Sequence, residues 1–361
     1  MTTTTTSTGI ANALTAGRLP KAAPWALLVA SWIVFVIVFM FIDAADDAVE
    51  FNIAAALFFG TILFDVLLFA VTYLVEGARQ ARDRLVTSLV ATAFIIALLP
   101  LVSLLYTVVS KGLARFDIEF FSNSMRNVVG EGGGGLHAII GTLLITGAAT
   151  LISVPIGLLT SIYLVEYGRG WLAKAITFFV DVMTGIPSIV AGLFAFALFS
   201  LLFNDAGIRF GFGGAVALSL LMIPVVVRSS EEMLRIVPNE LREAAYALGV
   251  PKWLAILKVV IPTALAGIAT GVTLAISRVI GETAPLLIIA GFTASMNYNL
   301  LSDRMMSLPV FVYTQYAYPG TDNQAYLDRA WAGALTLILI VMLLNLIARL
   351  IARFFSPKLG R

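Results

Sequence analysis

The stretch that most constrains the fold is VPNELREAAYALGVPKWLAILKVVIP, residues 237–262. Pro238 suits the first turn of a helix, where its missing amide hydrogen is not needed. Gly249 can adopt the left-handed turn that ends a helix, and Pro251 prevents the helix from continuing. The stretch therefore predicts a helical hairpin, with one short helix, a turn at Gly249, and a second short helix from about Lys252.

The first helix of this hairpin carries one apolar stripe. Its members recur at the helical spacing i, i+3, i+4 and i+7 and are Leu241, Ala244, Ala245 and Leu248. The two alanines make a smooth patch on which another protein can sit closely. A helix lying on lipid is the alternative. Four nearby acidic residues disfavour contact with anionic lipid: Glu231, Glu232, Glu240 and Glu243.

On both sides of the hairpin the chain is strongly apolar. The 361 residues are 60% hydrophobic and only 12% charged. Eight stretches are long enough to cross a bilayer as helices, which takes about 20 residues. They are residues 24–42, 51–75, 85–109, 136–163, 175–203, 212–230, 262–296 and 331–354. The alternating pattern of a membrane barrel is absent, so the sequence predicts an all-α polytopic membrane protein.

The chain divides into two expected parts. Residues 1–84 hold a Thr- and Ala-rich tail and two membrane helices, and residues 85–361 hold a six-helix bundle with the hairpin. The glycine-rich run GEGGGG, residues 130–135, lacks the Lys-Ser or Lys-Thr of a nucleotide-binding loop. It is therefore expected to be a flexible lead into the helix at Leu136.

Charge and composition restrict topology and chemistry. With the N-terminus inside, 15 of the 23 basic residues fall in inner segments and 6 in outer ones, which predicts that both termini are cytoplasmic. The basic residues lie where topology places them, so no nucleic-acid partner is expected. The sequence has no cysteine and His137 is its one histidine, so neither a metal site nor a cofactor is expected.

Two charged residues interrupt an apolar stretch. In SRVIGETAPLL, residues 277–287, Arg278 and Glu282 would share one face of a continuous helix. A charge near the bilayer centre costs several kcal/mol. The two residues therefore form either a structural ion pair or part of an anion pathway, because the guanidinium fork suits a tetrahedral oxyanion. Pro285 would loosen the helix just beyond them.

Two further charges lie in predicted spans. Arg228 follows Pro224 near the cytoplasmic end of its helix and is a second candidate for the anion pathway. Snorkelling of its side chain toward water is the alternative. Asp65 lies in the middle of the second span, where an acid is normally paired or protonated, and the sequence does not identify its partner.

The hairpin resembles the EAA loop of ABC-importer permeases. The matching residues are Glu243, Ala244, Ala245, Gly249 and the closing VVIP, residues 259–262. The usual ending is Ile-x-Leu-Pro, so the departure here is conservative. The resemblance implies a MetI-like permease core over residues 85–361 and a coupling helix that docks on a cytoplasmic ATPase. The chain has no Walker A pattern, so it is expected to be a permease subunit and not an enzyme.

Other runs resemble the PstA family of phosphate-specific ABC permeases. They are RVIGETAPLL (278–287), GIPSIVAGLFAF (185–196), GTLLITG (141–147), IYLVEYG (162–168) and SLPVFVY (307–313). The resemblance implies import of inorganic phosphate across a bacterial inner membrane, with Arg228, Arg278 and Glu282 in the anion path. It also implies three kinds of partner subunit: a PstC-like second permease, a PstB-like ATPase dimer and an external PstS-like binding protein. It says nothing of the two N-terminal helices.

Two rival functions remain open at this point. One is a permease for another oxyanion, such as sulfate, molybdate or phosphonate. The other is an ion-coupled carrier that needs no ATPase and uses Arg278 and Glu282 as a proton relay. A membrane-embedded enzyme is disfavoured, since the chain shows no recognisable catalytic constellation.

Overall fold

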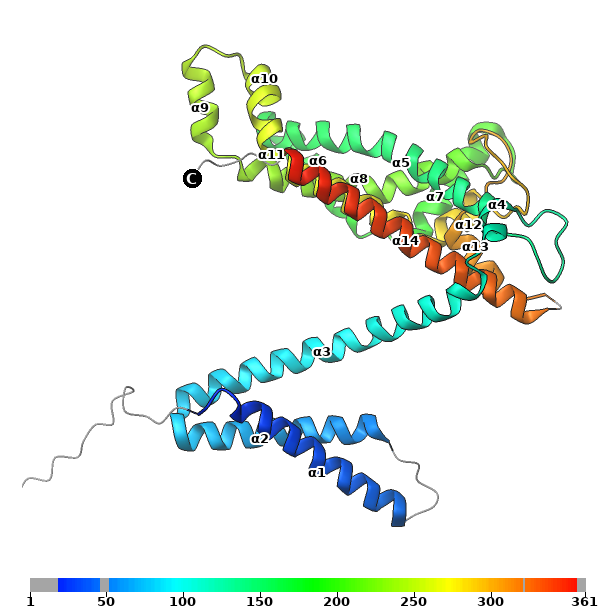
Figure 1. Ribbon diagram of the computed structural model, residues 1–361. Helices are drawn as coiled ribbons and strands as arrows, with labels where there is room; N and C mark the ends of the chain where they lie inside the picture. The colour runs from blue at the N-terminus through cyan, green and yellow to red at the C-terminus, as the bar shows by residue number, and fades with distance from the viewer. Residues whose placement is uncertain (1–18, 46–51, 321, 356–361) are drawn as a thin grey trace, which may run out of the picture. The chain divides into compact units, whose positions relative to one another are not determined.

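The computed structural model describes residues 19–45, 52–320 and 322–355, and most of the predicted N-terminal tail lies outside these ranges. Within the described part, the regular secondary structure is entirely helical. The chain forms two compact units, Met1–Leu104 and Leu105–Arg361, and helix α3 (Ala78–Gly112) runs from the first into the second (Figure 1). This division differs in meaning from the predicted boundary between residues 84 and 85, which marks where the six-helix permease core begins. That boundary stays a prediction.

The first unit contains a helical hairpin, α1 (Ala23–Ala45) and α2 (Ile53–Glu76), followed by the beginning of α3. Gly60 allows close approach of the two helices, because a Cβ there would lie 2.8 Å from Cδ1 of Trp32. The Trp32 indole N–H donates to the Thr61 hydroxyl at 3.1 Å. The Ser88 hydroxyl of α3 donates to Asp65 at 2.5 Å, which supplies the partner that the sequence did not identify.

The second unit holds the remaining helices. They are α4 (Ile118–Ser122), α5 (Leu136–Ile162), α6 (Trp171–Thr184), α7 (Ser188–Phe203), α8 (Gly211–Ile236), α9 (Asn239–Ala247), α10 (Lys252–Ala255), α11 (Ile261–Val279), α12 (Ala284–Ile289), α13 (Leu308–Ala317) and α14 (Asn323–Phe355). Short helical turns lie at η1 (Leu113–Arg115), η2 (Tyr163–Tyr167) and η3 (Ile256–Val260), of which the last two are π-helical. The hairpin of α9 and α10 lies at one end of this unit, and α12 and α13 lie at the other (Figure 1).

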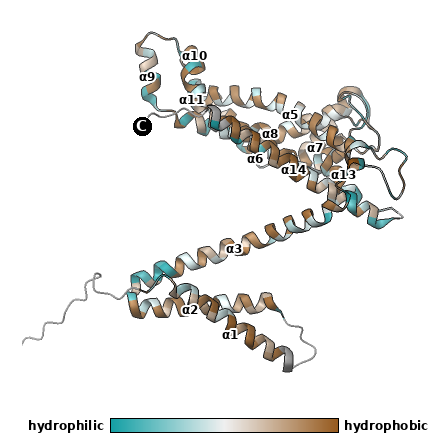
Figure 2. Ribbon diagram, viewed as in Figure 1, coloured by the Kyte–Doolittle hydropathy of each residue, from teal (hydrophilic) through white to brown (hydrophobic). Residues whose placement is uncertain are grey.

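The spanning helices agree with the predicted stretches in most places. Seven helices among the described residues are long and apolar enough to cross a membrane, and the bent pair α6 and α7 would make an eighth span. Apolar residues dominate these helices, whereas the start of α3 is polar (Figure 2). The fold is therefore that of an all-α polytopic membrane protein, as predicted.

Two of the predicted spans are broken. The stretch 175–203 bends by 109° between α6 and α7. The stretch 262–296 also fails as a single span, because α11 ends at Val279 and α12 begins at Ala284. The physical reason is similar in both places. Pro187 directly precedes α7 and disfavours helical geometry in Ile186. Pro285 lies in the first turn of α12 and lacks the amide hydrogen that a continuous helix would donate to the Gly281 carbonyl.

Small residues bring α8 and α11 together. A Cβ on Gly271 of α11 would lie 2.6 Å from Cβ of Ser229 in α8, so the glycine is needed for the approach of the two helices. Beside them, α5 packs along α8 around fully buried side chains that include Ala149, Leu218 and Met222. This packing fixes the register of α8 against α11, and both helices carry predicted site residues.

The glycine-rich run before α5 is packed, and the expectation of a flexible lead is wrong. Arg329 of α14, which is fully buried, donates to the carbonyl oxygens of Gly130 and Gly132 at 2.7 and 2.9 Å. A Cβ on Gly134 would lie 2.5 Å from the carbonyl oxygen of Phe120. The glycines therefore allow a tight backbone packing that a residue with a side chain would disturb.

Candidate functional site

The predicted hairpin is confirmed in its turn and in both helices. Helix α9 ends at Ala247, and Gly249 follows in the left-handed region with φ of +75°. Its amide N–H donates to the Tyr246 carbonyl at 2.9 Å, and the Val250 N–H donates to the Ala245 carbonyl at 3.1 Å. These bonds satisfy carbonyl groups that the end of a helix leaves free.

The apolar stripe of α9 divides between two environments. Ala245 is buried against the rest of the unit. Leu241, Ala244 and Leu248 are exposed, and Leu248 keeps 84% of its surface accessible. Glu243 is exposed on the same helix. The hairpin therefore presents small and apolar side chains outward, and among the described residues nothing covers them.

Arg278 lies in the last turn of α11, on a surface that the chain leaves open. Thr270, Leu274 and Arg278 recur at i, i+4 and i+8, and all three are exposed. The opposite face, with Gly271 and Ala275, is buried. Within the described ranges no carboxylate pairs with Arg278. The alternative of a structural ion pair inside this chain is therefore not what the structure shows.

Glu282 follows Arg278 after the helix has ended. It lies in the break before α12, and its backbone N–H donates to the Val279 carbonyl at 3.1 Å. The expectation that Arg278 and Glu282 share one helical face is wrong, because α11 stops between them. Glu282 is half-buried and, like Arg278, forms no ion pair with another described residue.

Arg228 is held by two carboxylates. Its guanidinium donates to Asp181 of α6 and, at 2.8 Å, to Glu231 one turn further along α8. Glu231 is buried and also accepts from Arg235 at 2.7 Å. These ion pairs join α6 to α8. The side chain of Arg228 therefore pairs with carboxylates of this chain and does not only extend toward water, as the snorkelling alternative has it.

Asp181 and Glu231 were missed in the sequence, although signals for both exist. Glu231 stands three residues after Arg228 and four before Arg235, which is the spacing of neighbouring residues on a helix. Asp181 is the lone charged residue in the apolar stretch 175–203.

The structure does not bring Arg228 and Arg278 together. Ser229, next to Arg228, faces Gly271, and Arg278 lies seven residues beyond Gly271 along α11. Seven helical residues correspond to about 10 Å. Arg228 thus lies nearer the hairpin, and Arg278 lies about two turns further from it.

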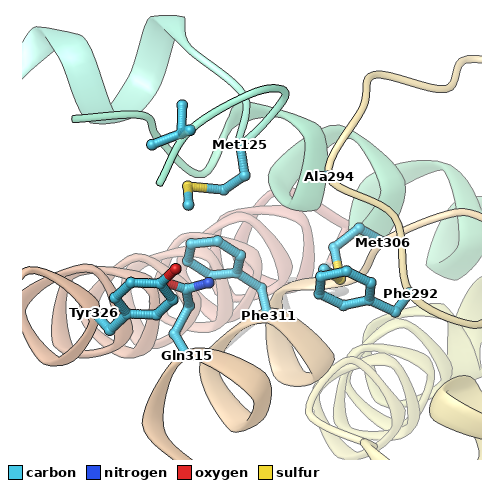
Figure 3. Close-up of a pocket in the computed structure, with 8 residues that line it drawn as sticks. Met125, Phe292, Ala294, Met306, Phe311, Gln315 and Tyr326 are labelled. Carbon is cyan, nitrogen blue, oxygen red and sulfur yellow. The ribbon is translucent and has the colours of Figure 1, made fainter. Parts of the chain in front are cut away.

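A partly open pocket lies at the end of the unit that carries α13. It has a volume of about 120 Å³, and Figure 3 shows its lining residues. Most of the lining is apolar, and the polar members are Gln315 and Tyr326. None of the predicted site residues lines it. In the described part of the chain, no group of three or more His, Asp or Glu residues is arranged to hold a metal ion.

Comparison with known families and proteins adds a second line of evidence. The family described as binding-protein-dependent transport system inner membrane component matches residues 153–361. A Mycobacterium tuberculosis protein, Phosphate transport system permease protein PstA 1, is 46% identical over 288 residues, which cover 78% of this chain and 91% of the relative. The corresponding PstA proteins of Haemophilus influenzae and Yersinia pestis are 41% and 38% identical, over 78% and 76% of this chain and 96% and 92% of the relatives.

Solved structures support the fold. The MetNI methionine ABC transporter, in an inward-facing conformation, matches with a TM-score of 0.51 at 21% identity, covering 62% of this chain and 96% of that one. A bacterial ABC transporter involved in the import of the acidic polysaccharide alginate matches with a TM-score of 0.53 at 14% identity, covering 76% of this chain and 97% of that one. At these identities the likeness concerns the fold alone.

Proposed function

This chain belongs to the family of binding-protein-dependent transport system inner membrane components, and on that premise we propose that it is the membrane permease of an ATP-driven phosphate importer. Relatives named phosphate transport system permease proteins share 38–46% of their residues with it over about three quarters of its length. Such permeases are non-catalytic subunits, and a separate subunit hydrolyses ATP. The chain is therefore an integral inner-membrane protein with a MetI-like fold.

The observation that carries the assignment of a pathway is the exposure of Arg278. A guanidinium that faced the hydrocarbon interior of a bilayer would cost several kcal/mol. The open stripe of α11 is therefore expected to be covered by a second permease subunit or by a water-filled path between the two. A guanidinium there offers a fixed fork of donors to the oxygens of phosphate.

Glu282 is expected to balance this charge. It stands in the helix break four residues after Arg278. It is therefore close to Arg278 along the chain but does not form an ion pair with the guanidinium. A nearby carboxylate keeps the empty site close to neutral, and it can accept a proton from a protonated phosphate. Arg228, nearer the hairpin, is the second proposed contact for the anion on its way inward.

The hairpin is proposed to connect these residues to the ATPase. Residues Lys252–Val279 form one continuous helical span, so the second arm of the hairpin extends directly into the helix whose last turn carries Arg278. Movement of the arm by the ATPase would shift that helix end. The break before α12 allows the shift without moving α12 by the same amount. Alternating access of Arg278 to the two sides would follow.

The proposed assembly contains three further kinds of subunit. A PstC-like permease completes the path, a PstB-like ATPase dimer binds the hairpin through Glu243, Ala244, Ala245 and Gly249, and a PstS-like protein delivers phosphate outside. The excess of basic residues in the segments on the hairpin side supports the orientation with both termini and the hairpin in the cytoplasm.

Transport by the reconstituted complex tests this proposal. Proteoliposomes that contain the chain, its second permease and the ATPase are given the loaded binding protein with labelled phosphate or labelled sulfate. We expect phosphate uptake that requires ATP and the ATPase subunit. Preferential sulfate uptake would favour a permease for another oxyanion. Phosphate uptake without the ATPase would favour an ion-coupled carrier.

A further inference from the structure

A buried glutamate lies where the hairpin meets the membrane helices. Glu166 belongs to η2, the π-helical turn that directly follows α5, and its side chain is only 5% exposed. Its carboxylate accepts from Nε of Arg242 and pairs with Nη2 of the same residue, both at 2.9 Å. Arg242 lies on α9, the first arm of the hairpin. A buried ion pair therefore joins the hairpin to the end of α5.

The same arginine also holds the end of α8. Its Nη2 donates to the Leu234 carbonyl at 3.0 Å, and its Nη1 donates to the Val237 carbonyl at 2.6 Å. These carbonyls belong to the last turn of α8 and the residue after it, where helical partners are missing. One guanidinium thus fixes α9 to both α5 and α8.

The second arm of the hairpin reaches the same glutamate. The Lys252 ammonium donates to the backbone carbonyl of Glu166 and lies 4.7 Å from the ring centre of Tyr167. Glu166 therefore receives one cation from each arm, through its side chain and through its backbone. We call the three residues Glu166, Arg242 and Lys252 the clasp.

The two arms differ in how they connect to the membrane helices. The second arm continues through η3 into α11 without interruption. The first arm is joined to α8 only through Val237 and Pro238, which have extended backbone. A movement of α9 is transmitted poorly to α8 through such an extended linker. The clasp supplies the directional contact that the covalent connection of α9 lacks.

The apolar packing beneath the hairpin does not provide a directional contact between α9 and the membrane helices. Val237, Val260 and Ile268 are buried there, with Leu158 and Ile162 of α5 against them. Apolar contacts are non-directional and allow sliding. A guanidinium that pairs with a carboxylate in a buried position keeps its geometry, because separation would leave an unpaired charge without water.

We propose that Glu166 is a positioning residue of the transport cycle, through which the clasp transmits movement of the hairpin into α5. The inference rests on the proposed function, since it presumes that an ATPase moves the hairpin. When the clasp is intact, α5 and α11 shift together with α9. When it is broken, the ATPase still binds and hydrolyses ATP, but α5 no longer follows.

The test is the ratio of phosphate imported to ATP hydrolysed by the complete reconstituted complex. Glu166→Gln keeps the shape of the side chain and removes the charge. We expect ATP hydrolysis within about twofold of wild type and a ratio lowered about tenfold. Arg242→Gln should lower the ratio at least as much, since it also removes the bonds to the Leu234 and Val237 carbonyls. The double variant should lower the ratio no further than Arg242→Gln alone, because both changes remove the same ion pair. Glu131→Gln, an exposed acid before α5, is the matched control and should leave the ratio unchanged.

Three results would overturn the clasp. One is an unchanged ratio in an assembled Glu166→Gln complex, and another is losses that multiply in the double variant. If Glu166→Gln fails to assemble, the transport ratio of Lys252→Gln tests the clasp instead. Lys252 is exposed, and its substitution leaves the buried pair of Glu166 and Arg242 in place. Lys252→Gln should lower the ratio less than tenfold but measurably, and an unchanged ratio would overturn the proposal. The ratio is measured with the oxyanion that wild type imports. A wrong substrate assignment then appears in wild type, whereas a wrong clasp appears only in the variants.

Discussion

Gly192 of α7 and Pro285 of α12 touch backbone to backbone. A Cβ on Gly192 would lie 2.5 Å from Cα of Pro285, which is closer than a real Cβ can approach. This contact holds α12 in place immediately after the break that contains Glu282. The position of the break relative to α7 therefore depends on the absence of a side chain at residue 192.

Gly192→Ala should displace α12 and reduce phosphate uptake. Overpacking against a backbone atom costs about 1–3 kcal/mol, because the backbone cannot rotate away as a side chain can. Uptake and thermal unfolding are measured together. Gly147→Ala in α5 is the matched control, since a Cβ there meets nothing within 4 Å. That variant should transport normally and be as stable as wild type or slightly more stable. Equal uptake by both variants would show that the contact does not position the site.

Removing the shared carboxylate of Glu231 should loosen α6 from α8. Among the described residues, Glu231→Gln leaves Asp181 as the one carboxylate paired with Arg228 and removes the ion pair of Arg235. Hydrogen bonds to charged groups contribute about 1.5–3 kcal/mol each, and the partial exposure of both arginines lowers that figure. We expect a lower melting temperature in detergent. Glu232→Gln changes the adjacent, exposed acid and should leave the melting temperature unchanged. Equal melting temperatures for both variants would contradict the role given to the network.

The turn of the hairpin requires a glycine. At φ of +75° a β-branched residue is strained by about 1–3 kcal/mol. Gly249→Val should therefore distort the hairpin tip and reduce co-purification of the ATPase, with the membrane helices intact. Gly77→Val places the same residue at φ of +94°, between α2 and α3, also with open space around it. If the hairpin is the docking surface, only the change at Gly249 releases the ATPase. Release by both variants, or by neither, would contradict that assignment.

The sequence predicted the features that are local. Pro238, Gly249 and Pro251 determine the hairpin through backbone preferences that act within a few residues, and the structure agrees with them to within one or two positions. The apolar spans follow from the length that a bilayer requires. The charge spacing of Glu231 between two arginines was equally local and was overlooked.

The remaining features depend on residues far apart in the sequence. Gly281, Glu282 and Pro285 signal the break at residues 280–283 locally, but the position of α12 after the break depends on its contact with α7. The pairing of Glu166 with Arg242 joins positions 76 residues apart, and the bonds from Arg329 to Gly130 and Gly132 join positions almost 200 apart. Such contacts arise only when the helices have packed, so hydropathy and local propensity do not reveal them.

The decisive measurement for the proposed role of Arg278 is phosphate uptake by a complex that carries Arg278→Gln. The side chain is exposed and makes no ion pair with the described residues, so the variant should fold and assemble with its second permease and ATPase as wild type does. We expect ATP-driven phosphate uptake to fall to the background level of liposomes that lack the complex. Uptake at the wild-type rate by the assembled variant would rule out the proposed anion path, because the anion would then cross without the guanidinium that is proposed to receive it.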